Sequence, residues 1–110
     1  MDTKQALEAL DALGQPSRLA IFRLLVQAGQ PGRSVGDIRA ALGLPAATLS
    51  NHLNILRQAG LVLDQRDGRS IVCRADFARM AGLVGYLTEN CCAGADCGVP
   101  GRAGAPHSPC

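Results

Sequence analysis

Three cysteines lie close together near the carboxyl end of the chain, and their spacing suits thiolate chemistry. Cys91 and Cys92 are adjacent and Cys97 follows shortly after, so that three thiols fall within seven residues. Trivalent arsenic and antimony are soft ions that bind three thiolates in a pyramid, whereas structural zinc usually takes four ligands. The three cysteines therefore predict a site for As(III) or Sb(III), and no organic cofactor is expected.

Other interpretations of the same thiols stay open. Cys91 could be a small core residue, and any two of the thiols could form a disulfide redox switch. Cys110 could add a fourth thiolate and complete a zinc or cadmium site. A methylated arsenical, with two exchangeable positions, would need only Cys91 and Cys92. Cys73 follows Ile71 and Val72 in a predicted strand and is interpreted as a packed residue.

Length and composition limit the class of protein. A chain of 110 residues is long enough for one domain. Hydrophobic residues (47%) outweigh charged ones (18%), which excludes a disordered chain, and three aromatic residues are too few for a protein that stacks single-stranded bases. No apolar run approaches the roughly 20 residues of a membrane helix, and no signal peptide opens the chain. We expect a cytoplasmic protein that does not bind membranes.

The spacing of apolar residues predicts five helices. They cover residues 2–13, 16–28, 34–42, 45–59 and 76–91, and the last carries an apolar stripe of Phe77, Met80, Val84, Leu87 and Cys91. The third and fourth helices are short and meet at Gly43. We expect one domain over residues 1–92 and a flexible tail rich in glycine and proline over residues 93–110, which contributes Cys97.

Two β-branched runs flank an Asp67-Gly68 pair and predict a β-hairpin. A two-residue turn at Asp67 and Gly68 would place Arg66 directly opposite Arg69. Like charges at such a position repel unless an anion lies between them. The hairpin therefore indicates a phosphate contact, and the alternative is that the two arginines extend separately into water.

The order of elements predicts a mainly α fold with a β-hairpin wing, namely a winged helix-turn-helix. The outward face of the fourth helix carries small and short polar side chains, with no Lys or Glu between Pro45 and Ile55. Asn can pair with adenine, and Ser or Thr can reach bases or phosphates. For His52, which lies beside the buried face, packing is an equally good interpretation. We expect double-stranded DNA to be contacted by Ala47, Thr48, Ser50, Asn51, His52, Asn54, Arg66 and Arg69.

Three segments together resemble the ArsR/SmtB family of metal- and metalloid-responsive repressors. They read PSRLAIFRLL at residues 16–25, LSNHLNIL at residues 49–56 and AGLV at residues 59–62. The resemblance spans about residues 4–92. It implies a homodimer built by the first and last helices, which binds operator DNA and leaves it when an effector binds.

The usual effector sites of that family are absent from this sequence. The Cys-Val-Cys pair of its arsenic sensors is replaced by Ser34-Val35-Gly36, and the last helix carries no histidine for a zinc site. Cys91, Cys92 and Cys97 resemble a second type of arsenic sensor in the family, which has an adjacent cysteine pair and a third cysteine just downstream. The resemblance thus implies a repressor released by As(III) or Sb(III).

The residues also bear on other classes of function. The sequence shows no Ser-His-Asp set, paired carboxylates or phosphate-binding glycine loop, so we do not expect an enzyme. A redox-sensing or zinc- or cadmium-sensing repressor of the same fold is the alternative to a metalloid sensor. A DNA-binding protein without any ligand is a third hypothesis.

Overall fold

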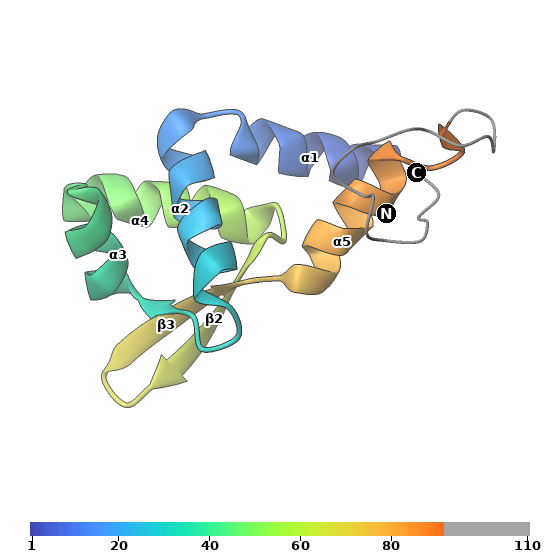
Figure 1. The fold of residues 1–110 in the computed structure, drawn as a ribbon. Helices are drawn as coiled ribbons and strands as arrows, with labels where there is room; N and C mark the ends of the chain where they lie inside the picture. The colour runs from blue at the N-terminus through green and yellow to red at the C-terminus, as the bar shows by residue number, and fades with distance from the viewer. Residues whose placement is uncertain (92–110) are drawn as a thin grey trace.

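The computed structural model describes residues 1–91, which form five helices and a three-stranded antiparallel sheet (Figure 1). The predicted winged helix-turn-helix is confirmed. The predicted tail, with Cys92, Cys97 and Cys110, lies outside the described residues. The elements are α1 (Thr3–Leu13), α2 (Pro16–Ala28), β1 (Arg33–Ser34), α3 (Val35–Leu42), α4 (Ala46–Gln58), β2 (Val62–Asp67), β3 (Ser70–Ala75) and α5 (Phe77–Leu87).

Four of the five described helices begin at a residue whose side chain caps the first turn, and α4, which follows Pro45, is the exception. The Asp2 side chain accepts a hydrogen bond from the Gln5 backbone N–H at 2.7 Å, and the Gln5 side chain accepts one from the Asp2 N–H. The Ser34 hydroxyl accepts from the Asp37 N–H at 3.0 Å at the start of α3. Gly43 ends α3 in the left-handed conformation with φ +65. These caps fix the short α3–turn–α4 unit that sequence spacing predicts.

The core forms around α2, which contacts α1, α3, α4 and β3. Helix α4 contributes Leu49, Leu53 and Leu56 to this core, and these are the inward positions that sequence spacing predicts. Burial of such leucines contributes roughly 1.5–3 kcal/mol each, so the rotation of α4 about its axis is firmly set. The largest fully buried side chains are Ile21, Leu25, Ile38, Leu49, Leu53, Leu56, Leu61 and Cys73.

Helix α1 buries its alanines and exposes its leucines. Leu7 and Leu10 are 61% and 41% exposed, although their spacing predicts an apolar side together with Ala6 and Leu13. Small side chains let α1 lie close to α2 and α4, and the leucines are left on the outer surface. The inward-facing residues are Ala6, Ala9 and Ala12.

The β2–β3 hairpin, which we call the wing, differs from the sequence prediction at its turn. Asp67 pairs with Ser70 and Arg66 with Ile71, so the turn residues are Gly68 and Arg69. Gly68 has φ +62, which suits the first central position of a type II′ turn. The prediction that Arg66 lies opposite Arg69 is therefore wrong, and the like-charge argument for a phosphate between them no longer holds. The two-residue strand β1, which pairs with β3, was not predicted.

Helix α5 begins after its Asp76 cap as predicted but ends at Leu87, before the predicted carboxyl end of the stripe. The Thr88 hydroxyl donates to the Val84 carbonyl at 2.8 Å and thereby satisfies a carbonyl of the last turn. Asn90 has φ +56, and the Cys91 N–H donates to the Thr88 carbonyl at 3.0 Å. The prediction that Cys91 continues the helical stripe is therefore wrong.

Two neighbouring helices carry exposed apolar side chains. Val84 and Leu87 of α5 are 45% and 57% exposed. Helices α1 and α5 contact each other and lie side by side, away from α3 (Figure 1). We refer to Leu7, Leu10, Val84 and Leu87 as the α1–α5 surface. Over residues 1–91, no helix is both long enough and apolar enough to span a membrane.

We expect Gly32→Ala to destabilise the fold more than Gly43→Ala. Both glycines have positive φ, which costs an alanine about 1–2 kcal/mol. A Cβ at Gly32 would also overlap the carbonyl oxygen of Cys73 in β3, whereas nothing lies within 4 Å of one at Gly43. Urea unfolding should show an additional loss of about 1–3 kcal/mol for Gly32→Ala. Equal losses for the two variants would contradict this packing of residue 32 on β3.

Candidate nucleic-acid interface and thiol site

The predicted outer face of α4 is exposed along the helix. Thr48, Ser50, Asn51 and Asn54 are solvent-exposed, as is Ala47, while Leu49, Leu53 and Leu56 anchor the opposite side in the core. The Gly43 turn holds α3 directly before this helix. A helix with this surface can enter a major groove and approach base edges closely. The contact of these side chains with DNA stays a prediction.

His52 differs from its neighbours on α4 because it is 9% exposed. Its Nδ1 lies 3.5 Å from Nη1 of Arg18 in α2. Arg18 in turn donates from Nε to the carbonyl of Ala12 at 2.7 Å, at the end of α1. His52 therefore joins α4 to the α1–α2 connection, and this position favours the packing interpretation over a DNA contact.

Two arginines are exposed near the tip of the wing. Arg66 lies in β2 and Arg69 in the turn. Although they are not paired across the hairpin, each remains a long cation able to reach a phosphate by itself. Both arginines of the predicted phosphate contact are therefore exposed on the wing, but they do not face each other across the hairpin.

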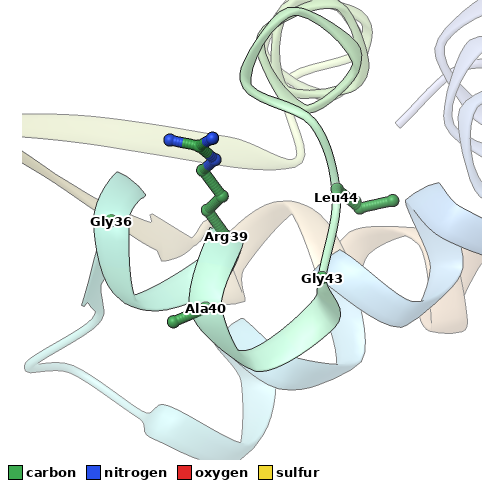
Figure 2. A pocket seen from close by; sticks show the side chains of 5 residues that line it. All are labelled: Gly36, Arg39, Ala40, Gly43 and Leu44. Carbon is green, nitrogen blue, oxygen red and sulfur yellow. The ribbon is translucent and has the colours of Figure 1, made fainter.

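An open hollow of about 490 Å³ lies at the α3–α4 turn (Figure 2). Gly36, Arg39, Ala40, Gly43 and Leu44 line it, and Arg39 is its charged residue. Arg39 is not among the residues for which sequence spacing predicts a DNA contact. The available signal was an exposed cation on the helix that precedes the turn, where a side chain can contact a phosphate.

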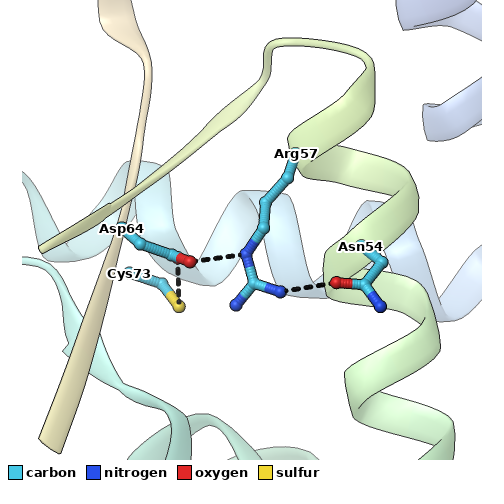
Figure 3. Close-up of polar contacts among 4 residues, drawn as sticks. All are labelled: Asn54, Arg57, Asp64 and Cys73. Atoms are coloured by element: carbon cyan, nitrogen blue, oxygen red, sulfur yellow. Dashed lines mark hydrogen bonds and ion pairs between the residues drawn. The ribbon is translucent and has the colours of Figure 1, made fainter.

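A chain of polar side chains connects α4 to the wing (Figure 3). Arg57 Nε of α4 lies 2.7 Å from Oδ2 of Asp64 in β2. Arg57 Nη1 donates to Oδ1 of Asn54 at 2.8 Å, and Cys73 Sγ donates to Oδ1 of Asp64 at 3.4 Å. Arg57 is therefore a partly exposed residue held in an ion pair. Sequence spacing missed the role of Asp64, which depends on the register that sets Asp64 opposite Cys73.

Cys73 is a buried thiol, as predicted. Burial, with additional contributions from the hydrogen bond and the negative charge of Asp64, raises its pKa from 9.0 to about 11. Because the thiolate is the reactive and metal-binding form, Cys73 is poorly suited to either role at neutral pH.

Of the three cysteines predicted to form the thiol site, the structure describes only Cys91. Cys91 lies in a half-buried turn after α5 and is disulfide-bonded. Within residues 1–91, no group of three or more His, Cys, Asp or Glu side chains is placed to hold a metal ion. Cys92 and Cys97 lie outside the described residues, so a site of three thiolates stays a prediction.

Comparisons with known proteins agree with this geometry. A family model described as a helix-turn-helix domain matches residues 13–65. The HTH-type transcriptional regulator YgaV of Escherichia coli (strain K12) is 39% identical over 89 residues, covering 81% of this chain and 88% of that protein. The HTH-type transcriptional repressor SmtB of Mycobacterium tuberculosis (strain CDC 1551 / Oshkosh) is 36% identical over 77 residues, 70% of this chain and 55% of the repressor. An ArsR-like transcriptional regulator from Rhodococcus sp. RHA1 has a TM-score of 0.70 and 26% identity, over 82% of this chain and 81% of that chain.

The chain belongs to the ArsR/SmtB family of winged helix-turn-helix transcriptional regulators. Its relatives are regulators of transcription, so the expectation that it is not an enzyme is confirmed. In this ArsR/SmtB protein the first and last helices contact each other, and the rest of the described chain consists of α2, α3, α4, β1 and the wing (Figure 1).

The raised pKa of Cys73 predicts a pH-dependent stability. The folded state keeps the thiol proton up to about pH 11, whereas the unfolded state releases it near pH 9.0. The free energy of unfolding therefore contains a contribution that is complete below pH 9 and is lost as the pH rises from 9 to 11. We expect urea unfolding under reducing conditions to show a smaller loss over this interval for Cys73→Ala than for the parent chain. Identical losses would contradict the assignment.

Proposed function

We propose that this chain is a dimeric repressor that leaves its operator when As(III) or Sb(III) binds Cys91, Cys92 and Cys97. Residues 1–92 would form the DNA-binding and dimerisation domain, and residues 93–110 would supply Cys97. We place the protein in the cytoplasm. The observation that carries the DNA half of the proposal is the exposed face of α4, whose small and short polar side chains are held outward by the buried leucines.

Operator recognition would combine α4 and the wing. Thr48, Ser50, Asn51 and Asn54 would approach base edges and nearby phosphates, while Arg66 and Arg69 would contact flanking phosphates. Phosphate contacts position the protein and base contacts give specificity. Affinity for the operator would therefore fall as the salt concentration rises.

Dimerisation through α1 and α5 is supported by the α1–α5 surface, whose four apolar side chains remain 41–61% exposed. A related structure, the homodimeric winged helix-turn-helix DNA-binding domain Mb0332 of Mycobacterium bovis, is 32% identical to this chain, with a TM-score of 0.62. A two-fold dimer would present two α4 helices to two half-sites of an operator.

Metalloid binding is supported by the position of Cys91 beyond the end of α5. Adjacent residues of a regular helix point in different directions, so Cys91 and Cys92 could not both face one ion if α5 continued through them. Because α5 ends at Leu87, this restriction does not apply to Cys91. The structure of a possible transcriptional regulator for arsenical resistance is 28% identical to this chain, with a TM-score of 0.64.

Contacts at the beginning of α5 offer a route from the thiols to α4. The Asp76 N–H donates to the Leu61 carbonyl at 2.8 Å, just after the end of α4. The Arg79 guanidinium lies against Gly60, in the space that a Cβ there would occupy. A movement of α5 on metalloid binding would therefore be transmitted to α4, with a coupling of about 1–3 kcal/mol in operator affinity.

A redox-sensing repressor is the second candidate, and the disulfide-bonded state of Cys91 favours it. The structure of reduced HlyU from Vibrio cholerae N16961 is 26% identical to this chain, with a TM-score of 0.63. In this case oxidation of two thiols, rather than a metalloid, would release the operator. Zinc or cadmium sensing, with Cys110 as a fourth ligand, would instead be recognised by release of the operator when Zn(II) or Cd(II) is added.

We expect Asn51→Ala to lower operator affinity by about 1–3 kcal/mol, the size expected for loss of a bidentate base contact. The affinity of the Asn51→Ala variant for arsenite, measured by calorimetry, should equal that of the wild type. Fluorescence anisotropy with a duplex selected by the wild-type chain from a random library gives the affinity. Gln27→Ala, on an exposed part of α2, is the control and should bind as wild type. Unchanged affinity for Asn51→Ala would contradict the assigned face.

We expect Cys91→Ser and Cys92→Ser to bind the selected duplex as wild type but to stay bound when arsenite is added under reducing conditions. Cys110→Ser is the matched control and should still be released. Release of both single variants by arsenite would place the sensor elsewhere. Release of the wild type by an oxidant and not by arsenite would favour the redox candidate, and release only by Zn(II) or Cd(II) would favour a four-thiolate site.

A further inference from the structure

We propose that Arg57 and Asp64 are positioning residues that fix the side-chain amide of Asn54 as a hydrogen-bond donor toward DNA. This inference rests on the proposed DNA-binding function and adds a specificity device to it. The observation that carries it is the chain of contacts from Cys73 through Asp64 and Arg57 to Asn54 (Figure 3).

The chemistry of Arg57 determines the orientation of the Asn54 amide. A guanidinium group has N–H donors and no acceptor, so the atom of Asn54 that lies 2.8 Å from Arg57 Nη1 must be the carbonyl Oδ1. The amide nitrogen is then on the other side of the group, as Figure 3 shows. Since Asn54 is exposed, this nitrogen is accessible from outside the protein.

A fixed amide reads DNA differently from a free one. Pairing with adenine requires both amide atoms, because the oxygen accepts from N6 and the nitrogen donates to N7. With its oxygen turned toward Arg57, Asn54 presents its N–H donors outward, and these suit purine N7, guanine O6, thymine O4 or a phosphate oxygen. Within residues 1–91 the Asn51 side chain has no hydrogen-bond partner, so both of its amide atoms are available. The two asparagines of α4 therefore differ in what they can recognise.

Asp64 keeps Arg57 in this orientation. Its Oδ2 lies 2.7 Å from Arg57 Nε, and the two side chains are only 33% and 28% exposed. The second oxygen, Oδ1, accepts from the Cys73 thiol at 3.4 Å, so that Asp64 is itself fixed from β3. Without the carboxylate, the flexible Arg57 side chain would gain other rotamers and would hold Asn54 less often.

A double-mutant cycle on operator affinity tests the inference with the full chain. The wild-type protein first selects a duplex from a random library, and anisotropy at one fixed salt concentration then compares wild type, Asn54→Ala, Asp64→Asn and the double variant. We expect each single change to weaken binding by about 3- to 10-fold, the size of one hydrogen bond. The loss caused by Asp64→Asn should be smaller in the Asn54→Ala background than in the wild type.

Asn51→Ala supplies the matched control cycle, because Asn51 lies on the same helix face without contacting Arg57. In the Asn51→Ala background, Asp64→Asn should lower operator affinity by the same factor as in the wild type, as expected for independent sites. If Asp64→Asn does not fold, Arg57→Lys takes its place. Lysine keeps the positive charge but cannot contact Asn54 and Asp64 through two separate nitrogens, as Arg57 does. Equal losses in all three backgrounds would overturn the inference.

The donor role has a separate test in Asn54→Asp. This change keeps an oxygen for Arg57 but replaces the outward donor with an acceptor, so it should weaken binding at least as much as Asn54→Ala. Affinity equal to the wild type would overturn the donor assignment. If the wild-type chain selects no duplex at all, the proposed DNA-binding function fails, and this outcome is distinct from a negative cycle.

Discussion

Burial of one side of α4 against the core is the constraint on which the rest of the molecule depends. Leu49, Leu53 and Leu56 fix the rotation of this helix, and a short polar face is thereby turned outward. His52 adds a polar contact to Arg18 at the edge of the same packed side. Because the buried and exposed faces belong to one rigid helix, any shift of the core contacts would also move the surface proposed to contact DNA.

Two further attachments relate α4 to the rest of the fold. The Arg57–Asp64 ion pair joins its last turns to the wing, and the Asp76–Leu61 hydrogen bond and the Arg79–Gly60 contact join its carboxyl end to α5. The proposed recognition helix is therefore held between the element that would contact flanking phosphates and the element that precedes the thiols. Under the proposed function, one structural change at the end of α5 would alter both base and phosphate contacts.

The sequence predicts the helices well because apolar residues recur at helical spacing, and because α1, α2, α3 and α5 begin at residues whose side chains accept a backbone N–H. Helix α4 begins after Pro45 without such a cap. It does not predict the turn of the wing, because an Asp67-Gly68 pair is compatible with two registers and the positive φ of Gly68 at the first turn position selects one of them. The end of α5 is missed since Thr88 caps it within an apolar pattern that continues to Cys91. The exposed side of α4 follows from spacing alone. In contrast, the Asn54–Arg57–Asp64–Cys73 chain requires the strand register, which no local pattern encodes.

The most direct test of the account is X-ray absorption at the arsenic edge on the full reduced chain loaded with arsenite. The account predicts one arsenic per protomer with three sulfur neighbours, and loss of a sulfur neighbour in the Cys91→Ser variant. Arsenic surrounded by oxygen in the wild-type chain, or a three-sulfur spectrum that is unchanged when Cys91 is replaced, would contradict it.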